Sequence, residues 1–231
     1  MLSVRAKGDA DVIAARLAEH GLSLRGGFNF GRGEDAPPAA SGRPARALLL
    51  VGNIGAAFWP HFERWRVSQN PVPTDPLDSW SRLVVDEVAR QAGARAVMPN
   101  DRPFQPFQQW AMRAEGLRPS PLGILIHPRY GLWHAYRAAL LFDSELETDA
   151  SAEKSTHPCD DCVDKPCLRS CPVDAYGPDG FAYERCLGHV RAADGRPCRD
   201  EGCLDRKACP VGGAYRYPVV VRQFFMKAFA A

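Results

Sequence analysis

The fold is decided by one stretch in the C-terminal third of the chain, Cys159-Asp160-Asp161-Cys162-Val163-Asp164-Lys165-Pro166-Cys167-Leu168-Arg169-Ser170-Cys171-Pro172. Its spacing differs from the bacterial ferredoxin motif only by two additional residues before the third cysteine. In that motif, three thiolates from one tight loop reach three corners of an iron–sulfur cube, and the cysteine before proline ligates a second cube. The stretch therefore predicts the first half of a domain that holds two 4Fe–4S clusters.

A second, looser set of cysteines follows and also ends in Cys-Pro, so the region is an imperfect duplication. Its members are Cys186, Cys198, Cys203 and Cys209. In two-cluster ferredoxins, the last cysteine of each half completes the cluster of the other half. We therefore expect Cys159, Cys162, Cys167 and Cys209 to hold one cluster. We expect Cys171, Cys186, Cys198 and Cys203 to hold the other.

Structural zinc and disulfides are the alternatives for these cysteines. Zinc usually takes two Cys-x2-Cys knuckles, and here only the pair Cys159 and Cys162 has that spacing. A disulfide-bonded protein would spread its cysteines widely, whereas the first 158 residues contain none. The chain also begins without a signal peptide, which predicts a cytoplasmic protein with reduced thiols. Iron–sulfur chemistry is thus the preferred interpretation.

Composition places few other limits on function. The 231 residues carry 29 basic and 27 acidic side chains, a net charge of +2. This balance lacks the strong positive field of a nucleic-acid-binding protein, so tRNA is not an expected partner. No apolar run approaches the roughly 20 residues that span a membrane, so no membrane association is expected.

Residues 1–148 read as one domain in which helices and strands alternate, which predicts a mixed α/β or α+β fold. Helices are expected over 9–20, 56–65, 77–91 and 106–114, and strands over 47–51, 94–98, 122–126 and 133–142. Two glycine-bearing segments, Gly26–Gly31 and Gly52–Gly55, are interpreted as turns between a strand and a helix. A polar linker is expected over 149–156, the two-cluster domain over 157–216, and a helix or tail packed on the body over 217–231.

A family resemblance rests on Leu122-Gly123-Ile124-Leu125-Ile126-His127-Pro128-Arg129-Tyr130-Gly131-Leu132-Trp133. This segment, placed ahead of a double ferredoxin motif, resembles epoxyqueuosine reductase, and the resemblance covers residues 75–216. Those enzymes bind cobalamin on an N-terminal domain related to cobalamin-processing proteins and to nitroreductases. The resemblance implies an α+β chain with a nitroreductase-like N-terminal domain and a small ferredoxin-type domain.

The chain also departs from that family. The family has a long C-terminal helical-repeat domain that helps bind tRNA, whereas only residues 218–231 follow Tyr217. The glycine- and lysine-bearing segment ahead of the histidine is replaced by residues 117–121. Asp101 is nearest by position to the family's catalytic aspartate, although the spacing needs an insertion. These departures argue against tRNA reduction and leave cobalamin handling as the expectation.

The cofactor pocket is predicted from aromatic residues, because a corrinoid needs a broad apolar cleft with aromatic walls and a few polar anchors. The candidates are Trp110, His127, Tyr130 and Trp133. Aromatic residues at such spacing also form ordinary cores, and His127 could simply satisfy a backbone group.

These expectations combine into an iron–sulfur oxidoreductase whose clusters deliver electrons to a cofactor, with cobalamin preferred over FMN. The electron donor would be a ferredoxin, a flavodoxin or a reductase. The alternatives are a non-catalytic ferredoxin-type electron carrier with a docking domain and a zinc-stabilised binding module.

Overall fold

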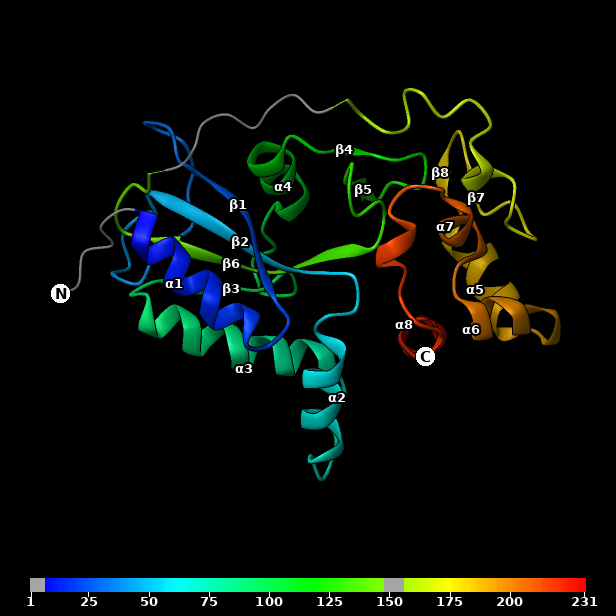
Figure 1. The fold of residues 1–231 in the computed structure, drawn as a ribbon, viewed down its shortest axis with the longest axis horizontal. Coiled ribbons are helices and arrows are strands. Elements are labelled where there is room, and N and C mark those ends of the chain that lie inside the picture. Colours follow the sequence, from blue (N-terminus) through cyan, green and yellow to red (C-terminus); the bar gives the residue numbers. More distant parts are fainter. Residues whose placement is uncertain (1–6, 148–155) are drawn as a thin grey trace. The chain divides into compact units, whose positions relative to one another are not determined.

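The computed structural model describes residues 7–147 and 156–231, which divide into two compact units (Figure 1). The sheet unit comprises residues 7–116 and 135–147. The cysteine unit comprises residues 117–134 and 156–231. The sheet unit is thus discontinuous, because the segment 117–134 packs with the cysteines although the predicted first domain, 1–148, includes it. The predicted linker, 149–156, lies outside the described residues except for Thr156.

The sheet unit is built on a four-stranded sheet in the order β1-β2-β6-β3. Its strands are β1 (Ser23–Asn29), β2 (Ala47–Ile54), β3 (Arg95–Val97) and β6 (His134–Phe142). Strand β1 pairs antiparallel with β2, and β3 pairs antiparallel with β6. Every residue of β2 before Ile54 is buried, so this strand is covered on both faces, as its continuous apolar sequence predicted.

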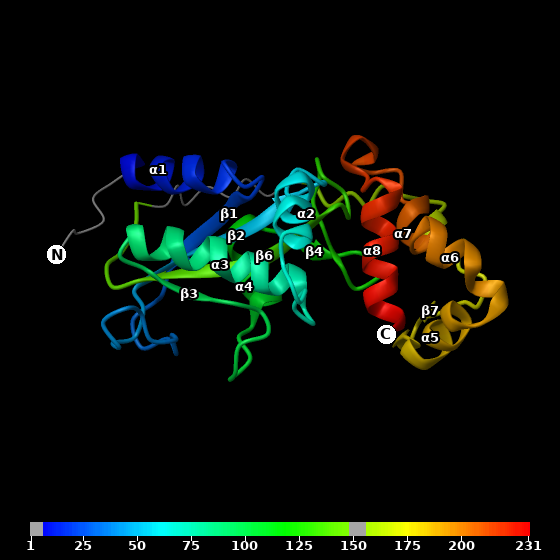
Figure 2. The same cartoon turned by 90° about the horizontal axis from the view of Figure 1, so that it is seen from below.

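The helices of the sheet unit occur within a few residues of the four predicted ranges. They are α1 (Lys7–Ala18), α2 (Trp59–Val67), α3 (Pro76–Gln91) and α4 (Phe107–Glu115). Helix α3 starts with a proline in its first turn and buries Leu77, Trp80, Val84 and Val88 along one stripe. Helices α1 and α3 contact each other and run alongside the sheet, and α4 packs against β1 (Figure 2). The α+β class is therefore confirmed.

The interpretation of Gly26–Gly31 as a turn between a strand and a helix was wrong, and that of Gly52–Gly55 is correct only from Gly55, where the turn between β2 and α2 begins. Gly26 and Gly27 lie inside β1, where the register with β2 shifts, and Gly26 has a positive φ of 74°. A Cβ on Gly27 would come within 2.4 Å of the Leu48 carbonyl oxygen. Gly52 lies inside β2, where a Cβ would come within 2.2 Å of the Ala135 carbonyl oxygen. These glycines allow close strand packing, a requirement that the hydrophobic pattern does not reveal.

The cysteine unit is made of short elements. Its strands form two hairpins, β4 (Arg118–Pro119) with β5 (Leu125–Ile126) and β7 (Tyr176–Gly177) with β8 (Gly180–Phe181). Its helices are α5 (Tyr183–Arg191), α6 (Arg196–Glu201), α7 (Leu204–Ala208) and α8 (Val219–Ala230), with single 3₁₀ turns at Pro166–Leu168, Ala193–Gly195 and Gly213–Tyr215. Helix α8 is the expected C-terminal helix, and it packs on α5 and α6. Across 7–147 and 156–231, each helix is too short or too polar to cross a bilayer.

Candidate functional site

The cysteines of the cysteine unit are arranged in two groups. The first thiol group is Cys159, Cys162, Cys167 and Cys209. Burial, followed by the charges of the other three members, raises the pKa of Cys167 to about 11. Cys167, Cys209 and Cys159 also share one apolar cluster. These four side chains therefore lie near one another, with Cys167 and Cys209 buried and Cys159 and Cys162 half-buried.

The second thiol group is Cys171, Cys186, Cys198 and Cys203. Burial, followed by the charges of the other three members, raises the pKa of Cys186 to about 11. The partition into two groups is the one that the crossover order of a two-cluster ferredoxin gives, while the role of these thiols as ligands stays a prediction. Among the described residues, no three His, Cys, Asp or Glu side chains are grouped so that they could hold a single metal ion.

Backbone N–H groups point at several of the sulfur atoms. The amide of Ala175 donates to Cys171 Sγ at 3.4 Å, and the amide of Val211 donates to Cys209. Burial raises the pKa of Cys203, while the amides of Arg206 and Asp205 donate to its sulfur and act in the opposite direction. Such N–H···S bonds stabilise the thiolate form, which is the form that ligates iron.

A tight turn in the cysteine unit presents His127. Its Nδ1 atom accepts hydrogen bonds from the backbone N–H groups of Arg129 (3.0 Å) and Tyr130 (3.2 Å), and its ring stacks on the Tyr130 ring at 4.0 Å. Because two donors occupy the Nδ1 lone pair, the neutral imidazole carries its proton on Nε2. The turn therefore holds His127 as a hydrogen-bond donor through Nε2.

The His127 turn rests directly on the chain that follows Cys209. A Cβ on Gly131 would lie 2.0 Å from the Val211 carbonyl oxygen, and one on Gly212 would lie 2.3 Å from the Tyr130 carbonyl. Both glycines have positive φ angles, 59° and 73°. Only glycine allows this approach without displacement of a backbone. The turn therefore packs closely against residues 209–212, which are called the Cys209 arm below.

Trp133 lies deeper in the cysteine unit and is 1% exposed. The Arg206 guanidinium lies 4.8 Å from its ring centroid, and the Tyr217 ring packs edge-on at 5.4 Å. The indole Nε1–H is buried, and no described residue accepts a hydrogen bond from it. A buried donor without an acceptor costs about 1–3 kcal/mol, so this N–H is a candidate for a bound acceptor.

The other two predicted site residues, Asp101 and Trp110, lie in the sheet unit and line one cavity of about 500 Å³. The Asp101 carboxylate accepts the Met98 amide at 2.8 Å and pairs with Arg82. Trp110 is 7% exposed and packs against Phe107. Of the four predicted pocket residues, the structure thus groups His127, Tyr130 and Trp133 in one unit and has Trp110 in the other. The catalytic role of Asp101 stays a prediction.

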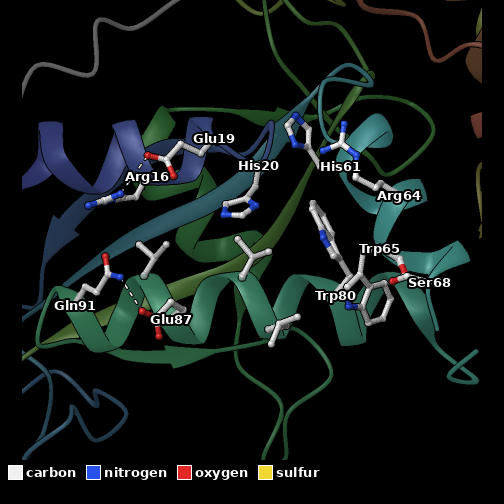
Figure 3. Close-up of a pocket in the computed structure, with 13 residues that line it drawn as sticks. Arg16, Glu19, His20, His61, Arg64, Trp65, Ser68, Trp80, Glu87 and Gln91 are labelled. Atoms are coloured by element: carbon white, nitrogen blue, oxygen red, sulfur yellow. Dashed lines mark hydrogen bonds and ion pairs between the residues drawn. The ribbon is translucent and has the colours of Figure 1, made fainter. Parts of the chain in front are cut away.

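A further cavity of about 800 Å³ lies between α1, α2 and α3 (Figure 3). The His20 and His61 rings line it with centroids 6.3 Å apart, and Trp65 and Trp80 contribute aromatic walls. Its residues come from three separate helices, so no local sequence motif could have predicted the cavity. The cavity contains no cysteine and none of the predicted site residues.

The sheet unit also contains a buried polar network that no sequence pattern predicted. Arg25 on β1 is 2% exposed and donates to both carboxylate oxygens of Glu115 on α4 at 2.9 Å. The Tyr136 hydroxyl on β6 donates to the same carboxylate. Burial, followed by the Glu115 charge, raises the pKa of Tyr136 above its usual value. No local signal pairs residues so far apart in the sequence.

No protein-family model matches the chain, and no curated protein matches it in sequence. Solved structures do resemble it. The C. elegans B12-trafficking protein CblC is 14% identical, with a TM-score of 0.52, over 96% of this chain and 93% of CblC. At this identity the likeness shows the fold, and it supports the resemblance inferred from the sequence at that level.

Epoxyqueuosine reductases resemble the chain less closely. The structure with a tRNA-Tyr stem loop is 13% identical, with a TM-score of 0.49, over 90% of this chain and 66% of the reductase. The Bacillus subtilis enzyme is 12% identical, with a TM-score of 0.47, over 76% of this chain and 50% of the enzyme. The chain therefore spans half to two thirds of these reductases, and the fold comparison rests on CblC alone.

Proposed function

We propose that the chain is an iron–sulfur redox protein that holds two 4Fe–4S clusters on its two thiol groups and delivers electrons to cobalamin on a nitroreductase-like fold. The observation that supports the proposal most is that Cys167 and Cys186 each lie among three other cysteines, so that the eight partly or fully buried thiols form two groups of four. Each group combines cysteines from both halves of the duplicated sequence, as two-cluster ferredoxins require.

The donor set fits such clusters. Thiolate is the ligand that iron–sulfur clusters prefer, and backbone N–H groups already point at Cys171, Cys203 and Cys209. Without metal, the raised pKa values keep the buried thiols protonated at neutral pH, so cluster assembly releases protons. When bound, the clusters supply one-electron transfer.

The His127 turn fits the polar periphery of a corrinoid. Its Nε2–H can donate to an amide carbonyl of the cofactor side chains, because the two backbone amides fix the tautomer. The likeness to CblC, which is described as a B12-trafficking protein, supports cobalamin ahead of FMN. When bound, cobalamin supplies the reductive chemistry, and the chain binds and orients it.

The same turn offers a short route from the first thiol group. Val211 donates its amide to Cys209, and its carbonyl lies against Gly131, beside the ring pair of His127 and Tyr130. Backbone contacts of this kind connect a cluster ligand to the proposed cofactor-binding turn without an intervening gap. A ferredoxin, a flavodoxin or a reductase would supply the electrons.

The decisive experiment is anaerobic purification with iron, acid-labile sulfide, zinc, cobalt and flavin measured on one sample. We expect about eight iron and about eight sulfide per chain, from two four-iron clusters. Added hydroxocobalamin is expected to co-elute on gel filtration and to change to a base-off visible spectrum.

Each part of the proposal can fail separately. A colourless protein that contains zinc would overturn the clusters. Full iron and sulfide with neither cobalamin nor flavin retained would contradict the cofactor and leave a ferredoxin-type electron carrier. Retained FMN without cobalamin binding would replace the corrinoid by a flavin.

A further inference from the structure

The cavity between α1, α2 and α3 lies within the sheet unit and has no part in the proposed function. Its volume of about 800 Å³ falls in the range of small-molecule sites in proteins, which is roughly 300–1,000 Å³. It shares no residue with either thiol group or with the His127 turn. A ligand that binds there is therefore additional to the clusters and to the cofactor.

The helices line the cavity with continuous faces. On α3, the lining residues from Trp80 to Gln91 are spaced by three and four positions, which is the spacing of one helix face. On α2, His61, Arg64 and Trp65 share one face in the same way. The lining side chains are therefore held by regular secondary structure.

The floor of the cavity is apolar. It is formed by buried residues of α3, which are Trp80, Val84 and Val88. Leu83 lines the same cavity but is 58% exposed, and Trp65 beside it on α2 is half-buried. One turn further along α3, the exposed lining residue is Glu87. This uncovered apolar surface suits a small molecule, because a partner helix needs apolar residues over several successive turns.

Nitrogen-bearing side chains gather toward one end of the cavity. The His20 and His61 ring centroids are 6.3 Å apart, and Arg64 follows His61 by one turn on the same face of α2. Figure 3 shows His61 and Arg64 at the end near Trp65, whereas Glu87 lies toward the opposite end. The hydrogen-bond donors of the cavity thus lie next to its aromatic walls.

The two carboxylates of the lining are already engaged by neighbouring residues of the chain. Glu19 pairs with Arg16 at 3.3 Å, and Glu87 pairs with Arg90 at 2.6 Å. Of the charged lining residues, all of which are described by the structure, Arg64 alone has no ion pair. The charge that a ligand can neutralise is therefore positive, and its complement is an anion.

We propose that this cavity binds a small aromatic carboxylate. The ring of the ligand packs on Leu83 and Trp65, where it gains apolar burial and aromatic contact. Its carboxylate accepts hydrogen bonds from the Arg64 guanidinium and from the imidazoles of His20 and His61. Arginine binds carboxylates through two parallel N–H donors, and a neutral imidazole adds one N–H donor.

The test is calorimetric titration of the whole chain, purified anaerobically, with β-naphthoate and with its neutral isostere β-naphthamide. We expect one β-naphthoate per chain and an affinity for β-naphthamide that is at least about tenfold weaker, because the amide lacks the charge that Arg64 pairs. Saturation with β-naphthoate should also shift the indole N–H resonance of Trp65, assigned with Trp65→Phe, and leave that of Trp133 in place.

Three variants separate the charge from the apolar surface. Arg64→Gln should weaken β-naphthoate binding about tenfold and leave β-naphthamide binding unchanged. Arg66→Gln is the matched control, because Arg66 lies on the same helix, pairs with Glu63 and does not line the cavity. It should change neither affinity. Leu83→Asp, at an exposed position, should weaken the binding of both ligands.

Three results would each overturn the inference. They are equal affinities for the two ligands, equal effects of Arg64→Gln and Arg66→Gln, and no saturable binding of β-naphthoate up to about 1 mM. The proposed function fails by different measurements, namely missing iron and sulfide or no retained cobalamin. Because the cavity contains no cysteine, those failures leave the carboxylate site standing.

Discussion

At the scale of single residues, the surroundings of each thiol determine its pKa. Cys167 and Cys186 have pKa values raised to about 11, from an ordinary value of 9.0, because burial and neighbouring thiols disfavour the charged form. In reduced, cluster-free protein at pH 8, the thiolate fraction of each should be about 100-fold lower than for an unperturbed thiol. Alkylation by iodoacetamide, followed residue by residue by mass spectrometry, should be correspondingly slow and should accelerate up to about pH 11.

The sign of this shift also bears on stability. A raised pKa means that the folded protein prefers the neutral thiol, so this contribution is present below pH 9 and is lost as the pH rises toward 11. Rapid alkylation of both residues at pH 8 would show that the cluster-free thiols are not buried together.

His127 can be tested by a substitution that separates its two roles. In His127→Asn, the amide oxygen can accept backbone N–H groups as Nδ1 does, so the turn should persist while the Nε2–H donor is lost. One lost hydrogen bond corresponds to about 0.5–1.5 kcal/mol, or roughly a 2- to 12-fold weaker affinity. Titration with hydroxocobalamin measures it, with iron content unchanged. Unaltered affinity would remove His127 from the cofactor site.

At the scale of elements, two glycines in tight turns make a matched pair. Gly131 and Gly123 both have positive φ, at 59° and 71°, but a Cβ meets Val211 at 2.0 Å in the first case and nothing within 4 Å in the second. Gly123→Ala should cost about 1–2 kcal/mol, the strain of a left-handed backbone. Gly131→Ala should cost more, because it also separates the turn from the Cys209 arm. Urea unfolding compares the two, and equal losses would show that the close approach is unimportant.

The ion pair between β1 and α4 should stabilise the sheet unit only while both partners are present. Arg25→Met leaves the Glu115 carboxylate without its cation at a site where the arginine side chain is 1% exposed. We expect a loss of about 3–5 kcal/mol in the free energy of unfolding. The matched control is Arg90→Met on the exposed pair Arg90–Glu87, which should cost less than about 1 kcal/mol. A small effect in Arg25→Met would mean that water reaches Glu115.

Elements with a strong periodic pattern could be predicted, and elements defined by close packing could not. The stripe of Leu77, Trp80, Val84 and Val88 predicted α3, and the apolar run from Ala47 predicted β2. Strand β1 was missed because Gly26 and Gly27 break its alternation, although they are the residues that let it bend against β2. The Arg25–Glu115 pair was missed because only the folded sheet brings the two residues together.

For the candidate site, too, sequence order supported some predictions, whereas features that depend on packing could not be predicted. Cysteine order along the chain predicts which four thiols would share a cluster, since crossover is a property of sequence order, and that division stays a prediction. Placing segment 117–134 with the cysteines required the packing of Leu122, Ile126 and Leu132 on Cys167 and Cys209. An apolar sequence does not indicate which of two hydrophobic cores its residues join. The first domain was therefore predicted as 1–148, with this segment included.

At the scale of the whole molecule, cluster loss should affect a discontinuous part of the chain. Cys167, Cys198 and Cys209 are buried in the cysteine unit, whose secondary structure elements are short. Metal binding and folding are coupled in such domains. After anaerobic iron removal by a chelator, amide hydrogen exchange should accelerate in residues 156–231 and also in 117–134.

The sheet unit provides the internal reference, since residues 7–116 contain no cysteine. Their amides should keep their protection when iron is removed. Equal acceleration of amide exchange over the whole chain would show that both units unfold cooperatively. Unchanged exchange in 117–134 would show that the stability of this segment does not depend on iron.

The interrupted course of the chain also has a consequence for biosynthesis. The ribosome completes β6, which lies between β2 and β3 in the sheet, before it makes any cysteine. By then the residues on both sides of segment 117–134 belong to the sheet unit, while the residues on which the segment packs have not yet been synthesised. The nascent polypeptide thus exposes the apolar side chains of Leu122, Ile126 and Leu132, on which the cysteine-bearing last third of the chain packs once it has been synthesised.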